Sequence, residues 1–147
     1  MNETLSQIAY VSRRSPGVSD DEVVDDIALP SYRKNRDLGV TGCLWFDQNH
    51  FVQVIEGPVA AIEALYETIR VDRRHRDLHK VLGSNITCRN FGRFSLKVVK
   101  DESMDPVRRL IDLVYGDRST ASGASDLVNE ILLATGQALQ HLAQAGT

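Results

Sequence analysis

Gln53 is the residue whose placement in this sequence most needs a chemical explanation. It is the one polar side chain in the run Phe51-Val52-Gln53-Val54-Ile55, which is typical of a strand buried on both faces. An amide buried without partners costs about 1–3 kcal/mol, so we expect Gln53 to be hydrogen-bonded. Because an amide both donates and accepts, it can also bind a partner in two orientations. Gln53 is therefore either a structural hydrogen-bonding residue or part of a switch.

Two further polar residues, Tyr10 and Asn35, are predicted to lie near this amide. Side chains alternate along a strand, so Gln53 lies on one face of its strand and Tyr10 on one face of the predicted strand Leu5–Ser12. If these strands are neighbours in register, the two side chains touch across the sheet. Asn35 is expected at the end of the first helix. Taken alone, a Tyr–Gln pair is more often a structural bond, and Asn35 a helix C-cap.

The first helix has a clear beginning and an internal irregularity. Ser19 is followed by three acidic residues, which fits a capping box at the positive end of a helix. The helix should extend to about Arg36. Pro30 lies inside it and has no N–H to donate, which predicts a kink or a break near Asp26–Ser31.

A hairpin and a second helix follow. The segments Val40–Asp47 and His50–Ile55 read as two strands that turn near Gln48-Asn49. Gly57-Pro58 then opens a helix, because proline is well tolerated in a first turn. Its apolar residues recur at helical spacing and predict one buried stripe, made by Ile62, Leu65, Tyr66 and Ile69.

The remaining elements complete an α+β fold. A charged loop over Asp72–Asp77 leads to two more strands, predicted over Val81–Arg89 and Phe94–Val99. The order βαββαββ is ferredoxin-like, with strands one and three side by side at the centre of the sheet.

The central run is apolar on both faces, so both faces of the sheet must be covered. We expect the two helices on one face and a two-helix C-terminal extension on the other. These last helices are predicted from Asp105-Pro106 to Gly116 and around Leu127–Leu142. The chain thus divides into a domain over residues 1–100 and a helical cap or output segment over 101–147.

Composition narrows the class of protein. The chain is 42% hydrophobic and 25% charged, with a formal net charge of −3, which is typical of a globular protein and argues against nucleic acid as a partner. There is no signal peptide and no apolar run of about 18 residues, so we expect a cytoplasmic protein that does not bind membranes. Cys43 and Cys88 have no metal-site or disulfide spacing and are expected to be ordinary buried thiols; no metal is predicted.

Four stretches of the sequence together resemble one family. They are Tyr10-Val11-Ser12, Ser31-x-x-x-Asn35-x-x-x-Gly39-Val40-Thr41-Gly42, Phe51-Val52-Gln53-Val54-Ile55-Glu56-Gly57, and Asp72-x-Arg74-His75. In this order and at this spacing, over about residues 5–98, they resemble the short single-domain type of the BLUF family, the blue-light sensors that use FAD. The resemblance makes a functional role for Tyr10, Asn35 and Gln53 the favoured interpretation.

The resemblance implies a photoreceptor, not an enzyme, that binds flavin non-covalently between the first two helices. The cofactor would be FAD, with FMN or riboflavin as alternatives. Asn35 would hydrogen-bond the polar edge of the ring, and Gln53 would bridge the ring and Tyr10. Tyr10 would give an electron and a proton to the excited flavin, after which Gln53 rearranges by rotation or by tautomerisation. The other cofactor-binding residues that the resemblance implies are Ile27, Ser31, Lys34, Ile69, Arg74 and His75.

Several positions depart from the family pattern or have an ordinary alternative. The last strand of the family usually carries a tryptophan and, two residues later, a methionine, whereas this sequence has Phe94 and Leu96. The route by which the switch would inform that strand is therefore open. For Lys34 the favoured interpretation is a solvated lysine, for Arg74 a solvated charged face, and for His75 a structural loop histidine.

Other functions are compatible with the same order of elements. An RNA-recognition module would need an RNP-like string around Phe51 and a basic face, and an acylphosphatase-like enzyme would need an Arg–Asn pair with a phosphate-binding loop; neither appears. A light-insensitive ferredoxin-like domain that binds a ligand or a protein remains the alternative. No cyclase, phosphodiesterase or DNA-binding effector is expected after Lys100. We therefore expect output through contact with an unknown downstream protein, and homo-oligomers formed through the apolar Leu127–Leu142.

Overall fold

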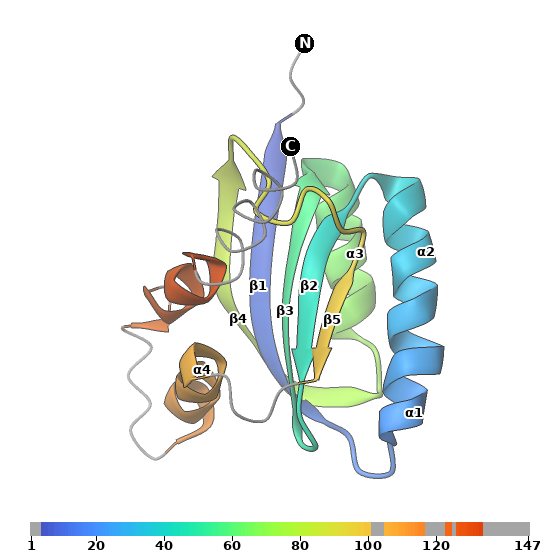
Figure 1. Cartoon of the computed structure of the whole chain (residues 1–147), viewed down its shortest axis with the longest axis vertical. Helices are drawn as coiled ribbons and strands as arrows, with labels where there is room; N and C mark the ends of the chain where they lie inside the picture. The colour runs from blue at the N-terminus through green and yellow to red at the C-terminus, as the bar shows by residue number, and fades with distance from the viewer. Residues whose placement is uncertain (1–3, 101–104, 117–122, 125, 134–147) are drawn as a thin grey trace, which may run out of the picture.

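The computed structural model of the chain describes residues 4–100, 105–116, 123–124 and 126–133. Its centre is a five-stranded mixed sheet of order β4-β1-β3-β2-β5 (Figure 1). The central strands β1 and β3 are antiparallel, and the edge strand β5 runs parallel to β2. The predicted α+β ferredoxin-like fold, with strands one and three at the centre, is confirmed. The strands are β1 (Leu5–Arg14), β2 (Thr41–Phe46), β3 (His50–Pro58), β4 (His75–Ile86) and β5 (Lys97–Lys100).

The bounds predicted for the last two strands were wrong. β4 begins at His75, inside the segment predicted as a charged loop, and ends at Ile86. Its side chains are mostly exposed or half-buried because only one of its edges is paired, with β1, and an edge strand tolerates charged residues that a central strand would exclude. β5 begins only at Lys97, since residues before it form a turn in which the Phe94 N–H donates to the Phe91 carbonyl at 2.9 Å.

The first helix is wound unevenly but does not break. It consists of α1 (Asp20–Glu22), the π-helical η1 (Val23–Ala28) and α2 (Leu29–Leu38). Ser19 caps its beginning by accepting from the Glu22 N–H at 3.2 Å, as predicted. Of the kink or break predicted near Asp26–Ser31, the break is absent, because Pro30 falls in the first turn of α2. The irregularity is instead the wider winding of η1, which overlaps the start of that segment.

The first helix and α3 (Val59–Arg70) cover one face of the sheet, as predicted (Figure 1). α3 begins directly after Pro58, while Gly57 still belongs to β3. Two separate apolar clusters hold these helices. The first helix packs Val23 and Ala28 on Leu44, Phe46, Phe51 and Leu96, and α3 packs Ile62 and Leu65 on Ile8, Val40 and Ile55.

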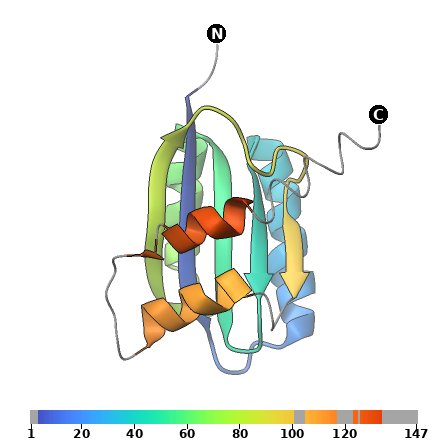
Figure 2. The ribbon, with the colours of Figure 1, turned by 60° about the vertical axis from the view of Figure 1, so that its left-hand side comes forward.

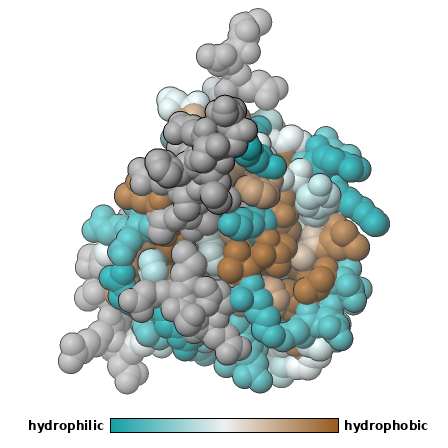
Figure 3. Space-filling model, viewed as in Figure 1, coloured by the Kyte–Doolittle hydropathy of each residue, from teal (hydrophilic) through white to brown (hydrophobic). Residues whose placement is uncertain are grey.

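The opposite face is covered by α4 (Asp105–Tyr115) and by the helical residues 126–133 (Figure 2). Figure 3 shows hydrophobic residues near the middle of this face, with hydrophilic residues around them. The two-helix covering predicted for this face is confirmed as far as residue 133, whereas Leu139 and Leu142 lie outside the described residues. The division of the chain at residue 100 stays a prediction. The core of this face consists of Ala9, Val11, Cys43, Trp45, Val52, Val54, Phe91, Val107, Leu110, Ile111, Ala124, Val128, Ile131 and Leu132.

Two other predictions concern cysteines and membranes. Cys43 is buried, and burial raises its pKa to about 12. Cys88 is exposed, so the expectation of two buried thiols was wrong for it, because it follows the end of β4 at the edge of the sheet. Among the helices described here, none combines the length and the apolar character needed to cross a bilayer.

Candidate functional site

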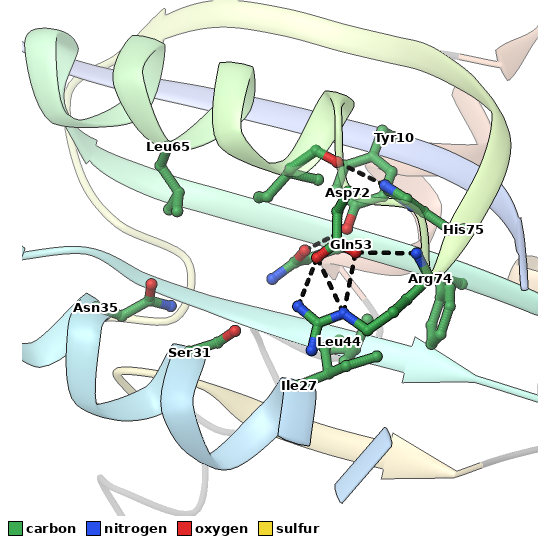
Figure 4. A pocket seen from close by; sticks show the side chains of 12 residues that line it. Tyr10, Ile27, Ser31, Asn35, Leu44, Gln53, Leu65, Asp72, Arg74 and His75 are labelled. Carbon is green, nitrogen blue, oxygen red and sulfur yellow. Dashed lines mark hydrogen bonds and ion pairs between the residues drawn. The ribbon is translucent and has the colours of Figure 1, made fainter. Parts of the chain in front are cut away.

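A cavity lies between the first helix, α3 and the sheet (Figure 4). It encloses about 560 Å³, counting the part open to solvent. Every predicted cofactor-binding residue except Lys34 lines it. Lys34 is exposed on α2 and does not reach the cavity. The lining residues are Tyr10, Ile27, Ser31, Asn35, Leu44, Phe51, Gln53, Leu65, Ile69, Asp72, Arg74 and His75.

Tyr10 and Gln53 form a hydrogen-bonded pair on the floor of this cavity. They face each other in the register of β1 and β3, and the Tyr10 hydroxyl donates to the Gln53 Oε1 at 2.5 Å. Both side chains are buried, with Tyr10 4% and Gln53 6% exposed. Burial raises the pKa of Tyr10 far above its usual value, and the nearby Asp72 carboxylate raises it further. Tyr10 is therefore a neutral donor in the resting protein.

The second end of the Gln53 amide is open to the cavity. Its Nε2 has no hydrogen-bond acceptor in the described part of the chain, and Gln53 lines the cavity. In Figure 4 this end of the side chain points away from Tyr10 and toward Asn35. An amide fixed at one end by a phenol thus has two N–H donors available for a bound molecule.

Asn35 faces the same cavity from α2. Its side chain is 1% exposed, and its Nδ2 donates to the Ser95 carbonyl at 2.8 Å. Its backbone carbonyl accepts from the Val40 N–H at 2.8 Å, so the residue also helps to end the helix. The Oδ1 of its amide has no donor among the residues described. The cavity thus offers an unpaired acceptor from Asn35 as well as the unpaired donor from Gln53.

The segment that departs from the family pattern contacts the cavity through its backbone. Asn35 binds the carbonyl of Ser95, the residue between Phe94 and Leu96. Leu96 is buried in the apolar cluster of the first helix, and the Phe94 carbonyl accepts from the Gly42 N–H at 3.1 Å. The connection from the cavity to the start of β5 is therefore a hydrogen bond from the Asn35 side chain to a main-chain carbonyl, which uses neither the Phe94 nor the Leu96 side chain.

His75 ties the floor of the cavity to the end of α3. Its Nδ1 lies 2.7 Å from the Ser12 hydroxyl and its Nε2 lies 2.6 Å from the Ile69 carbonyl. A carbonyl can only accept, so Nε2 carries the proton of this bond. The ring also packs edge-on against Tyr10, with centroids 5.8 Å apart. His75 therefore has both predicted properties, since it is a structural anchor and it lines the cavity.

An ion pair between Asp72 and Arg74 stands at the rim of the cavity. The Arg74 Nε lies 2.9 Å from the Asp72 Oδ1, and its Nη2 also contacts this carboxylate. The Arg74 side chain is 41% exposed and the Asp72 side chain 28%, whereas the residues on the floor of the cavity are buried. The hydrogen bonds from Arg74 lower the pKa of Asp72, and those same bonds raise the pKa of Arg74.

Four lining residues were missed by the sequence-based prediction, and each had a signal. Phe51 shares the strand face of Gln53, and Leu44 is paired with Gln53 across β2 and β3. Leu65 precedes Ile69 by one helical turn. Asp72 belonged to the quoted Asp72-x-Arg74-His75 stretch but was not assigned to the site. The missed residues supply one apolar patch and the carboxylate of the rim.

Comparison with known proteins agrees with this geometry. Residues 5–97 match the family model described as BLUF, sensors of blue-light using FAD. The chain belongs to the BLUF family. BLUF proteins are flavin-binding blue-light sensors, and the part of this chain that matches is such a sensor.

Individual BLUF relatives cover different shares of the chain. The dark-state structure of BlrB, a BLUF protein, superimposes with a TM-score of 0.68 at 30% identity, over 91% of this chain and 99% of that one. A structure of Klebsiella pneumoniae BlrP1 with FMN and cyclic diGMP gives a TM-score of 0.60 at 31% identity, over 65% and 26%. The blue light- and temperature-regulated antirepressor BluF of Escherichia coli (strain K12) is 29% identical over 115 residues, or 69% of this chain and 28% of its own length. The chain thus spans less than a third of that relative.

Proposed function

We propose that the cavity holds the flavin ring and that Tyr10 and Gln53 on its floor are the light-operated switch. The single observation that carries the proposal is the buried bond from the Tyr10 hydroxyl to the Gln53 Oε1 at 2.5 Å. A flavin ring has apolar faces and one edge with carbonyl acceptors and an N–H donor. The apolar residues Ile27 and Ile69 match the faces, and the open amide groups of Gln53 and Asn35 match the edge. Ser31, Arg74 and His75 complete the proposed contacts, and exposed Lys34 is the weakest member of the set.

When bound, flavin supplies the chromophore for blue light and becomes a strong oxidant when excited. Tyr10 would be the residue that gives one electron to the excited flavin, and its phenolic proton would move along the existing bond to the Gln53 amide. Burial favours this paired transfer, because a lone phenolate or a lone charge on the amide would be poorly solvated at this depth. When the electron and the proton return, Tyr10 is regenerated and Gln53 remains in a rearranged hydrogen-bonding state. Gln53 can rearrange by rotation or by tautomerisation, and both routes are compatible with the positions of Tyr10 and Gln53.

Substitution of the two residues tests the assignment. Tyr10→Phe and Gln53→Leu should still bind flavin and be yellow, but both should lose the red-shifted state in light-minus-dark difference spectra. Tyr66→Phe is the matched control, since Tyr66 lies on α3 and does not line the cavity; it should photocycle as the parent does. A normal photocycle in Tyr10→Phe or Gln53→Leu rejects the roles proposed here. A preparation that stays colourless after reconstitution with flavin favours the light-insensitive alternative.

We propose FAD as the flavin used in the cell, because the family description names it. FMN and riboflavin share the ring that the cavity would hold, so the floor residues do not discriminate among them. Chromatography of the flavin released from protein purified from its native cells identifies the form. Recovery of FMN or riboflavin alone contradicts this part of the proposal.

We further propose that residues 101–147 are the output segment and that the signal passes by protein contact in the cytoplasm, to a downstream protein or within a homo-oligomer. α4 supports this, since it covers the sheet face opposite the cavity through Val107, Leu110 and Ile111. One rearranged hydrogen bond is worth about 0.5–1.5 kcal/mol, so it can bias only an element already poised between two states. Hydrogen exchange compared in light and darkness should change within residues 105–133. Unchanged protection there counts against these helices as output.

A further inference from the structure

The irregular first helix leaves a backbone acceptor that a residue of the cavity rim can reach. Through η1 the bonds span five residues, and the last one runs from the Leu29 N–H to the Val24 carbonyl. The next donor along the chain would be residue 30, but Pro30 has no N–H. The carbonyl that an α-helical donor at position 30 would satisfy is that of Asp26, four residues earlier. Proline thus removes the ordinary partner of this carbonyl at the side of the helix that carries Ile27.

Arg74 supplies the missing donor from the other side of the cavity. Its Nη1 donates to the Asp26 carbonyl at 2.8 Å, while its Nε and Nη2 hold the Asp72 carboxylate after α3. One planar guanidinium therefore bridges the connection between α3 and β4 to η1, and Figure 4 shows it lying between the two helices. A fork of fixed donors can make both sets of bonds at once, which a lysine ammonium cannot do with the same geometry.

The position of this bridge decides what it can do. The floor residues Tyr10, Gln53 and Asn35 are at most 6% exposed, whereas the side chains of Arg74 and Asp72 are 41% and 28% exposed. The bridge is therefore at the solvent side of the cavity and the switch at its bottom. A molecule on the floor has to pass between helices that the guanidinium fastens together.

We propose that Pro30 is a positioning residue that makes Arg74 a latch across the mouth of the flavin cavity, so that the latch slows flavin entry and release. This inference rests on the proposed flavin site, but it concerns exchange and not photochemistry. Pro30 acts through the carbonyl of Asp26, and Arg74 closes the rim because that carbonyl is free to receive it. The hydrogen bond of the latch is to the backbone carbonyl of Asp26, while the side-chain carboxylate of Asp26 adds only a charge attraction to Arg74.

Pro30→Ala tests the latch, because alanine restores an N–H that can compete for the Asp26 carbonyl. Flavin release from the loaded protein can be measured on dilution as a rise in flavin fluorescence. Release should become about tenfold faster, as expected for loss of one charge-assisted hydrogen bond. The light-minus-dark spectrum should not change. In the flavin-free protein, nitrogen-15 NMR should show faster exchange of the Arg74 guanidinium protons with water. Arg74→Lys should also accelerate release, which keeps the test open if Pro30→Ala folds poorly.

Two controls separate the latch from other effects. Asp26→Asn removes a charge that attracts Arg74 but keeps the backbone carbonyl that receives the hydrogen bond, so it should accelerate release much less than Pro30→Ala does. Pro106→Ala removes a proline at the start of α4, on the opposite face of the sheet, and should also leave release unchanged. The latch is rejected if Pro30→Ala releases flavin at the parental rate, or if Asp26→Asn releases it as fast as Pro30→Ala does. Failure of the parent protein to take up flavin rejects the proposed function instead.

Discussion

On the side of the first helix and α3, the sheet presents Tyr10 and Gln53 to a cavity, and on the side of α4 it presents Val11 and Val54 to a closed apolar core. The same strands make both faces, because successive side chains point in opposite directions. Each residue of the switch is thus one position away from a residue that packs against α4. Each central strand therefore carries one residue of the switch and a neighbouring residue that packs in the core under α4. A shift of the strand would move both.

Polar groups are distributed differently on the two faces. On the cavity side they lie at the centre, where Tyr10 and Gln53 are bonded and part of the Gln53 amide is left open. The α4 side also carries buried polar groups, since the Gln7 Nε2 of β1 donates to the fully buried Glu56 carboxylate of β3 at 3.1 Å. Arg108 binds Asp47 at 2.7 Å, and the Tyr115 hydroxyl donates to the Val11 carbonyl at 3.2 Å. The contrast teaches that the α4 face is filled by its core, while the cavity face keeps an open space beside its polar groups that packing alone would not select.

The largest expected effect is on stability and belongs to the packed face. Leu110 is fully buried in α4, so Leu110→Ala should lower the free energy of unfolding by about 2–5 kcal/mol through lost burial and a cavity. Urea unfolding of the flavin-free protein measures this change. The dark absorption spectrum of the loaded variant should match that of the parent, because Leu110 does not contact the flavin side.

Gln53→Leu is the counterpart on the other face. It should lower the free energy of unfolding by about 1–3 kcal/mol, because the buried Tyr10 hydroxyl loses its acceptor, and it also removes the switch. If Leu110→Ala abolishes the photocycle while remaining folded, or Gln53→Leu unfolds the protein, the separation of roles between the faces is wrong.

The next effect concerns the turn between β2 and β3, where Asp47 binds the α4 side chain Arg108. Burial alone would raise the pKa of Asp47, but the hydrogen bonds from the His50 side chain and from the Asn49 and His50 N–H groups lower it to about 2. A lowered pKa means that the carboxylate stabilises the fold above pH of about 4 and that this is lost as pH falls toward 2, an effect of about 2 kcal/mol.

Denaturant unfolding between pH 5 and pH 2 checks this sign. The parent should lose stability over the lower part of that range, and Asp47→Asn should lose less of it because it has no carboxylate to protonate. Asp37→Asn is the matched control, since its carboxylate is largely exposed on α2, and it should keep the parental slope. An identical slope in Asp47→Asn and the parent contradicts the prediction.

The smallest effect concerns the end of α4. The Tyr115 ring lies between the Arg13 guanidinium, 4.4 Å from its centroid, and the His50 ring, and its hydroxyl also contacts the Asp77 carbonyl. Tyr115→Phe keeps the ring contacts and loses the hydroxyl bonds, which should cost about 1 kcal/mol of unfolding free energy. Tyr32→Phe, on the exposed side of α2, should cost almost nothing. Equal effects of the two variants would show that the hydroxyl of Tyr115 does not fasten α4.

Much of the site could be predicted because the positions of its residues follow from strand alternation and helical spacing, which depend on near neighbours in the sequence. Strand alternation placed Tyr10 opposite Gln53, and the spacing of Ile62, Leu65 and Ile69 identified the buried stripe of α3. The errors arose where tertiary contacts replaced local rules. Pairing with β1 made a strand of residues predicted as a charged loop, and Pro30 shifted the winding of the helix rather than breaking it.

The sequence alone determined which residues alternate to each face, where the helices begin, and that a polar amide lies in an apolar strand, because these properties depend on neighbours a few positions away. Only the tertiary structure decided that this amide accepts from Tyr10 and keeps its other end open, that Arg74 spans the rim to the Asp26 carbonyl, and that Lys34 stays outside. Those outcomes depend on the distance between elements far apart in the chain. The packing of the helices on the sheet sets these distances, and they cannot be read from the type of any single side chain.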